Sequence, residues 1–184
     1  MSPRLPFPSS FRHSGPMQVA LALVLCLTLH ADTALGQSPA DNGGASGWAF
    51  SLGAFDIIDS DKATEFGLEY RFDTFKLWRL DLNPVLGLSA TSEGNYWGYG
   101  GFRWDVPTGS ERWITTLGFA VSAYEQGDGK DLGGVVEFRS SIDLAYRLRN
   151  GSRIGLSFYH LSNARIYDLN PGSESLILTW SAGR

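Results

Sequence analysis

The stretch Glu65-Phe66-Gly67-Leu68-Glu69-Tyr70-Arg71-Phe72 (residues 65–72) alternates strictly between apolar residues at even positions and charged residues or glycine at odd positions. Successive side chains of a β-strand point to opposite faces, so this alternation predicts a strand with one apolar and one polar face. A helix would instead repeat its apolar positions every three or four residues. The stretch therefore indicates a strand that separates two different environments.

Seven further runs repeat the same two-residue period along the chain. With the first stretch they predict eight strands, at about 48–54, 66–72, 78–88, 96–106, 113–121, 142–148, 154–158 and 176–180. Pro84 falls inside the third run. Because proline has no N–H to donate to a ladder, we expect a bulge or a split strand there.

Eight alternating strands fit two architectures. A soluble barrel or sandwich turns its apolar face inward, whereas a transmembrane barrel turns it outward to lipid. Aromatic residues near the ends of the runs favour the membrane form, as do the charged residues gathered on the less apolar face. Those charged residues are Glu65, Glu69, Arg71, Glu137, Arg139, Asp143 and Arg147. The expected fold is all-β, an eight-stranded antiparallel transmembrane β-barrel of the outer-membrane type.

The connecting segments agree with that fold. With both termini in the periplasm, short turns should follow the even-numbered strands and longer external loops the odd-numbered strands. The predicted periplasmic turns lie at 73–74, 107–110 and 150–151, and the predicted external loops at 59–62, 91–95, 125–131 and 163–173.

The beginning of the chain predicts a secretory signal. Basic residues precede the apolar run 17–29, and small residues occupy positions 34 and 36, the −3 and −1 positions of a cut after Gly36. The run is too short for a membrane-spanning helix, so we expect residues 1–36 to be a cleaved signal peptide. A lipoprotein signal at Cys26 is the competing interpretation, which the leucine before that cysteine disfavours. The polar segment 37–46 is expected to be a flexible leader, and 47–184 a single barrel domain.

Composition then excludes several classes of protein. Cys26 is the only cysteine, so a chain that starts at residue 37 has neither a disulfide framework nor a thiol nucleophile. It keeps 13 basic and 18 acidic residues, a net charge of −5. That charge argues against nucleic acid as a partner.

The segment from Phe158 to Glu174 carries the candidate chemistry. Strand alternation places His160 and Ser162 on the apolar face of one strand, and Glu174 on the apolar face of the next. Ionisable residues on a lipid-facing surface are costly and indicate function. We expect Ser162 as a nucleophile, His160 as general base and then acid, and Glu174 as the group that orients the imidazole.

The oxyanion of such a reaction needs hydrogen-bond donors. Asn163, Asn170 and the backbone amides from Ala164 to Gly172 are the local supply. A structural interpretation remains open, because a Ser, a His and a Glu near an external loop are individually ordinary. His160 is nevertheless the only histidine outside the predicted signal peptide.

The loop residues Asp128, Lys130 and Asp131 are interpreted as solvated, with calcium or lipopolysaccharide contact as the functional alternative.

The motif His-x-Ser-Asn-Ala, five residues, then Asn-x-Gly-x-Glu resembles the signature of the PagL family, lipid A 3-O-deacylases of Gram-negative outer membranes. It consists here of His160, Ser162, Asn163, Ala164, Asn170, Gly172 and Glu174. The resemblance implies a serine esterase with a Ser162–His160–Glu174 triad and an eight-stranded barrel in the outer membrane. The implied substrate is lipid A in the outer leaflet, which would lose its ester-linked 3-hydroxyacyl chain at position 3.

The resemblance also implies no metal or other cofactor and is compatible with a homodimer. Arg165 departs from the pattern, since a small residue such as glycine is expected after Ala164. If that backbone amide helps to form the oxyanion hole, the departure puts the geometry of the loop in question.

The alternative function is a non-catalytic outer-membrane barrel, an adhesin, a structural barrel or a narrow channel. A soluble periplasmic lipid-binding barrel comes third.

Overall fold

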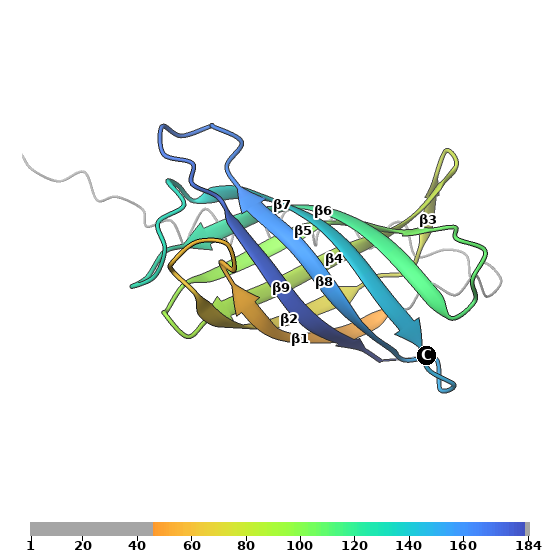
Figure 1. Ribbon diagram of the computed structural model, residues 1–184. Helices are drawn as coiled ribbons and strands as arrows, with labels where there is room; N and C mark the ends of the chain where they lie inside the picture. The colour runs from red at the N-terminus through yellow and green to blue at the C-terminus, as the bar shows by residue number, and fades with distance from the viewer. Residues whose placement is uncertain (1–45, 183–184) are drawn as a thin grey trace, which may run out of the picture. The chain divides into compact units, whose positions relative to one another are not determined.

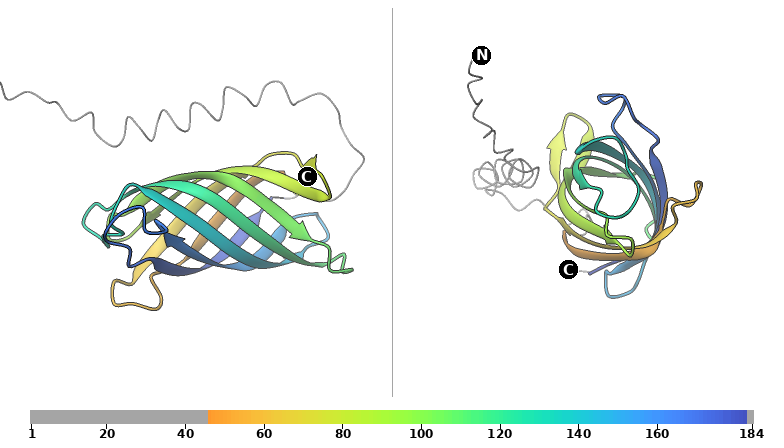
Figure 2. Two further views of the ribbon diagram at one scale, coloured as in Figure 1. Left: turned by 90° about the horizontal axis from the view of Figure 1, so that it is seen from above. Right: turned by 90° about the vertical axis from the view of Figure 1, so that its left-hand side faces the viewer.

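The computed structural model describes residues 46–182, which form one antiparallel sheet closed on itself (Figure 1). Its strands are β1 (Gly47–Phe55), β2 (Ala63–Arg71), β3 (Phe75–Leu77), β4 (Leu80–Thr91), β5 (Tyr96–Val106), β6 (Trp113–Glu125), β7 (Val136–Arg147), β8 (Arg153–Ser162) and β9 (Ser173–Ser181). Neighbours in sequence pair around the sheet, and β1 pairs with β9 to close it. Figure 2 shows the strands tilted around the axis of the closed barrel.

β2 and β3 are two sections of one barrel strand, because both pair with β4. The barrel therefore has eight strands, and the predicted fold class is confirmed. The predicted signal peptide (1–36) and residues 37–45 of the predicted leader lie outside the described residues. Within 46–182, no helix has the length and apolarity needed to cross a membrane.

The break between β2 and β3 arises from Pro84 on their shared partner. β4 runs through Pro84, but its pairing with β2 ends at Val85 and resumes on β3 only at Leu82. The Asn83 side chain fills this gap by donating to the Phe72 carbonyl at 3.2 Å and to a neighbouring threonine hydroxyl at 2.7 Å. The strand break predicted at Pro84 is therefore found in the partner strand. It lies between β2 and β3, opposite the proline, which has no N–H to donate.

This arrangement corrects one predicted turn. Residues 73–74 form the interruption between β2 and β3 rather than a hairpin turn. The hairpin instead turns at 78–79, between Leu77 and its ladder partner Leu80. Trp78 adopts a φ of 56° there and is 94% exposed. An aromatic residue is unusual in that left-handed conformation, which explains why turn propensity pointed to the Asp-Thr pair instead.

The outward face of the barrel is apolar. Large hydrophobic side chains such as Phe50, Leu88, Phe119, Leu156 and Leu178 stand about half exposed along the strands. Ring pairs gather at the end where β1 begins and β9 finishes, among them Trp48–Tyr70, Trp113–Tyr146 and Phe50–Trp180, with centroids 5.0, 5.1 and 5.9 Å apart. This pattern is typical of a lipid-facing belt with an interfacial aromatic girdle.

The inward face is polar and charged, and four of its charged side chains form a paired network. Glu69 accepts hydrogen bonds from Arg71 at 2.8 Å and from Arg103 at 2.9 Å. Arg103 also binds Asp143 across the lumen, and all four side chains are at most about one tenth exposed. The predicted polar lumen is therefore present as a network spanning β2, β5 and β7.

Toward the other end, the lumen is filled by an apolar and aromatic cluster. Phe55, Trp97 and Tyr124 pack together with ring centroids 5.6 and 5.8 Å apart. Leu132 and Leu161 complete this cluster and are almost fully buried. Because these residues lie where β1 and β8 end, the loops that follow those strands are next to this buried, packed cluster.

Replacing Arg103 by methionine should destabilise the barrel strongly, because it leaves Glu69 and Asp143 as buried carboxylates without that cation. Loss of one partner of a buried ion pair costs about 3–5 kcal/mol. Lys76→Met is a matched control, since it breaks an exposed pair with Asp81 of 2.7 Å, for which the expected cost is at most about 1 kcal/mol. Urea unfolding in detergent micelles, followed by tryptophan fluorescence, measures both; equal losses would contradict this account of the lumen.

Candidate functional site

His160 and Glu174 are direct ladder partners on β8 and β9. The His160 Nδ1 atom lies 2.9 Å from the Glu174 Oε1 atom. Both side chains are on the outward face, 43% and 22% exposed, beside the exposed apolar Phe158 and Leu176. The structure thus brings together the predicted base and its orienting carboxylate. Because the carboxylate occupies Nδ1, the Nε2 atom is the nitrogen available to a nucleophile.

Ser162 is the last residue of β8, two positions beyond His160 on the same outward face. Within residues 46–182 its hydroxyl makes no hydrogen bond, so the Ser162–His160 contact is not formed in this structure. Contacts of this kind are often loose without substrate and tighten in the complex. A second serine, Ser140 on β7, is exposed on the outward face and is the direct ladder partner of His160 on the other side. Sequence reasoning missed it, because the predicted strand began only at residue 142.

The loop after Ser162 is organised by Asn163, which is fully buried. Its side-chain amide nitrogen donates to the carbonyls of Leu132 at 2.7 Å and Leu169 at 2.9 Å. Its backbone amide donates to Asn170 Oδ1 at 3.0 Å, and its own Oδ1 accepts from the Arg165 amide at 3.0 Å. Both side-chain protons of Asn163 are therefore engaged in holding the loop.

Ala164 and Arg165 adopt φ values of 53° and 64°. This left-handed conformation is the one that glycine adopts without strain, so the backbone at Arg165 has the geometry that the family pattern assigns to glycine. The bond from the Arg165 amide to Asn163 holds it there. The Ala164 amide has no hydrogen-bond partner among the described residues, and it lies two positions after Ser162.

Gly172 supports the imidazole from the far end of the loop. It has a φ of 71°, and a Cβ atom placed on it would lie only 2.8 Å from His160 Cε1. A side chain at this position would therefore push against the ring. The ring is held between this glycine and the Glu174 carboxylate.

Two other loops brace the site, and sequence reasoning did not identify their contacts. Gly133 (φ 96°) packs so closely on the Leu169 carbonyl that a Cβ would lie 1.9 Å from it, and Gly134 packs against the Tyr167 ring. From the opposite side, the Ile57 amide donates to the Glu174 carbonyl at 2.8 Å. The Gly133-Gly134 pair was the one signal in the sequence for these contacts, since adjacent glycines permit close approach of another backbone.

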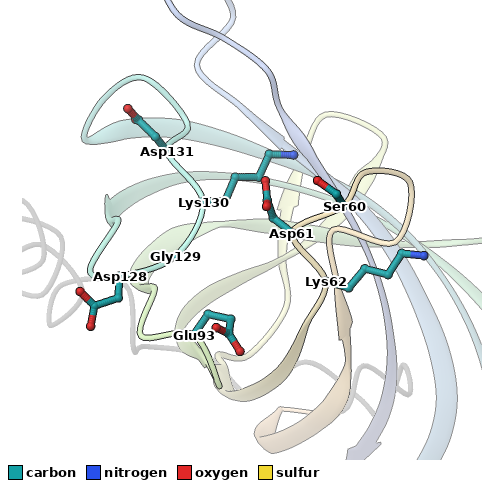
Figure 3. Close-up of a pocket in the computed structure, with 8 residues that line it drawn as sticks. All are labelled: Ser60, Asp61, Lys62, Glu93, Asp128, Gly129, Lys130 and Asp131. Atoms are coloured by element: carbon teal, nitrogen blue, oxygen red, sulfur yellow. The ribbon is translucent and has the colours of Figure 1, made fainter.

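The loop residues expected to be solvated behave differently from one another. Asp128 and Asp131 are exposed and line a hollow of about 480 Å³ at the loop end of the barrel (Figure 3). Lys130 is buried instead, and its ammonium lies 2.7 Å from Asp56 and 2.8 Å from Asp59. Burial opposes the charge of Lys130, but the hydrogen bonds and charges of those carboxylates raise its pKa above the ordinary 10.5. Among residues 46–182, no group of three His, Cys, Asp or Glu side chains is placed to hold a metal ion.

Comparison with known proteins places these residues in a family context. The family model described as lipid A 3-O-deacylase (PagL) matches residues 64–182. The chain is 34% identical over 114 residues to the lipid A deacylase PagL of Bordetella bronchiseptica, a match that covers 56% of this chain and 62% of that protein. The crystal structure of the outer membrane enzyme PagL superposes with a TM-score of 0.59 at 19% identity, over 74% of this chain and 99% of that one.

The contact between Gly172 and the imidazole generates a prediction. Gly172→Ala should displace the His160 ring, whereas Gly109→Ala should not, although Gly109 has a similar φ of 73° and open space around its Cα. Both changes carry a comparable backbone cost of about 1–2 kcal/mol. In a chain that starts at residue 37, His160 is the only histidine, so its ring ¹⁵N signals in micelles report the displacement directly. Unchanged ring signals in Gly172→Ala would contradict the proposed support.

Proposed function

Because the chain belongs to the lipid A 3-O-deacylase (PagL) family, we propose that it hydrolyses the ester-linked 3-hydroxyacyl chain at position 3 of lipid A. The observation that carries the proposal is the His160–Glu174 pair at 2.9 Å on the apolar outer face of the barrel. A hydrogen-bonded base and carboxylate beside Phe158 and Leu176 are accessible to a substrate that is itself embedded in lipid. The same pair inside a water-filled lumen would not be accessible to that substrate.

In the proposed mechanism, Ser162 attacks the ester carbonyl while His160 Nε2 takes the hydroxyl proton. Glu174 fixes the ring tautomer and stabilises the imidazolium that forms. His160 then returns the proton to the departing sugar oxygen, which leaves as the 3-hydroxyl of lipid A, and the acyl group remains on Ser162. A water molecule, deprotonated by the same imidazole, then attacks this acyl-enzyme; as the ester bond to Ser162 breaks, the imidazolium returns the proton to the serine oxygen and the 3-hydroxy fatty acid is released.

The oxyanion is assigned to the loop after the nucleophile. The Ala164 amide, free of a partner within the described part of the chain, is the proposed donor. Asn163, Asn170 and Gly172 support it, because they set the path of the loop and the position of the ring. This assignment also favours Ser162 over Ser140 as the nucleophile, since only Ser162 adjoins such a donor.

We place the protein in the outer membrane of a Gram-negative cell, after cleavage of the signal peptide at 1–36. The apolar outer belt suits lipid, and the longer loops lie at the end that carries the site, which by the usual asymmetry of such barrels faces outward. In this orientation, we propose that the site acts on lipid A in the outer leaflet. The mechanism needs no metal or other cofactor, and it is complete within one chain, so a homodimer is not required for it.

Ser162→Ala should abolish the reaction, with a fall in kcat of at least about 10³-fold. Mass spectrometry of lipid A from expressing cells should show the loss of one 3-hydroxyacyl chain with the wild type and none with this variant. Glu174→Ala should reduce activity less, because removing the orienting group generally costs less than removing the nucleophile.

Ser140→Ala is the matched control, because it removes the other outward serine next to His160 and should leave lipid A processing intact. Loss of activity in Ser140→Ala with retention in Ser162→Ala would reverse the assignment of the nucleophile. Unaltered lipid A beside a correctly inserted wild-type barrel would instead favour the non-catalytic barrel.

A further inference from the structure

Lys130 is a buried cation in the loop between β6 and β7. Its side chain is only 6% exposed, and its two carboxylate partners, Asp56 and Asp59, belong to the loop between β1 and β2. Asp56 is completely buried, whereas Asp59 is 54% exposed. Figure 3 shows Lys130 extending from its own loop toward the loop that carries Ser60 and Asp61. The residue therefore ties together two loops that are far apart in the sequence.

The backbone of Lys130 is fixed as well. Its carbonyl accepts hydrogen bonds from the Tyr124 hydroxyl at 2.7 Å and from Asn95 Nδ2 at 3.2 Å. Asn95 belongs to the loop between β4 and β5, and it is itself held by Thr91 at 2.7 Å. Three loops thus meet at Lys130. Because its backbone is fixed, a change in its side chain alters the contact with the β1–β2 loop directly.

One route leads from Lys130 to the proposed catalytic carboxylate. Asp56 is held by the ammonium, and the next residue, Ile57, donates its amide to the Glu174 carbonyl at 2.8 Å. Asp56 has a φ of 56°, a conformation that costs energy outside glycine and persists only where the surroundings enforce it. Glu174 is the residue that holds the His160 ring.

A second route leads from the same loop to the segment after Ser162. Leu132, two residues beyond Lys130, accepts the bond from the Asn163 side chain at 2.7 Å. Gly133 packs directly on the Leu169 carbonyl. The loop that Lys130 anchors therefore also sets the position of the proposed oxyanion donor at Ala164.

We propose that Lys130 is a positioning residue for the deacylation reaction, acting through Asp56 and Ile57 on Glu174 and through Leu132 and Asn163 on the oxyanion loop. The proposal rests on the proposed function. Without this lysine, Asp56 is a buried carboxylate that lacks its cation, which costs stability, but the strands are still held by their ladders and by the charge network in the lumen. Removing the ammonium should therefore misplace the catalytic groups without unfolding the protein.

The test compares Lys130→Met, Lys130→Arg and the control Lys76→Met, using purified full-length protein in detergent micelles with lipid A as substrate. Lys76 forms an ion pair of the same 2.7 Å length, but it lies in the β3–β4 hairpin, away from the site. Misplacement of catalytic groups by about 1 Å costs about a hundredfold in rate. We expect kcat of Lys130→Met to fall by about ten- to a hundredfold with KM within about twofold, partial recovery in Lys130→Arg, and no change in Lys76→Met.

The outcomes separate the inference from the function beneath it. If the wild type releases no 3-hydroxy fatty acid, the proposed function fails. If the wild type is active and a folded Lys130→Met has normal kcat, the positioning role is wrong and the function stands. An equal fall in kcat for Lys130→Met and Lys130→Arg, or a rise in KM without a fall in kcat, would also overturn the positioning role. If Lys130→Met does not fold, Asp56→Asn, which keeps the shape of the side chain, takes its place, and normal kcat in that variant overturns the inference.

Discussion

Closure of the sheet is the constraint on which the rest of the structure depends. A strand edge left open in hydrocarbon would expose unpaired N–H and C=O groups, each costing several kcal/mol, so a sheet with an apolar outer face must close. Here β1 closes it by pairing with β9. The same pairing brings the loop after Phe55 next to the start of β9, where the Ile57 amide reaches the Glu174 carbonyl. The closure that satisfies the backbone thus also sets the position of Glu174.

Strand alternation then divides the polar residues between two uses. At inward positions, Glu69 and Asp143 are neutralised in the lumen by Arg71 and Arg103. At outward positions of the same barrel, polar side chains are costly, and within the described strands His160 and Glu174 are found facing each other there. A shift in register by one residue would exchange the two sets, which would bury the His160–Glu174 pair among the lumen charges and expose those charges to lipid. Stability and the site therefore depend on the same register.

Local periodicity made most of the barrel predictable, and where it was interrupted the prediction failed. The shared facing of His160, Ser162 and Glu174 follows from strand parity alone, so the sequence was sufficient to predict it. The start of β7 at Val136 was not predictable in this way, because the outward Ser140 interrupts the apolar series. The hairpin at residues 78–79 was hidden by an aromatic residue in a turn. Burial of Lys130 was hidden for a different reason: its partners lie more than seventy residues away, and a loop sequence carries no signal of which distant loop it will meet.

Arg165 shows how such distant contacts compensate for a local departure. An arginine in the left-handed region carries about 1–2 kcal/mol of strain that glycine would not. The bond from its amide to Asn163 Oδ1 opposes that strain, and Asn163 is in turn held by Leu132 and Leu169. The loop therefore keeps its path through bonds from a neighbouring loop rather than through the conformational freedom of its own residue. The same hydrogen bonds therefore have two consequences. They allow an arginine at position 165, and they make the path of the loop after Ser162 dependent on the loop that carries Leu132.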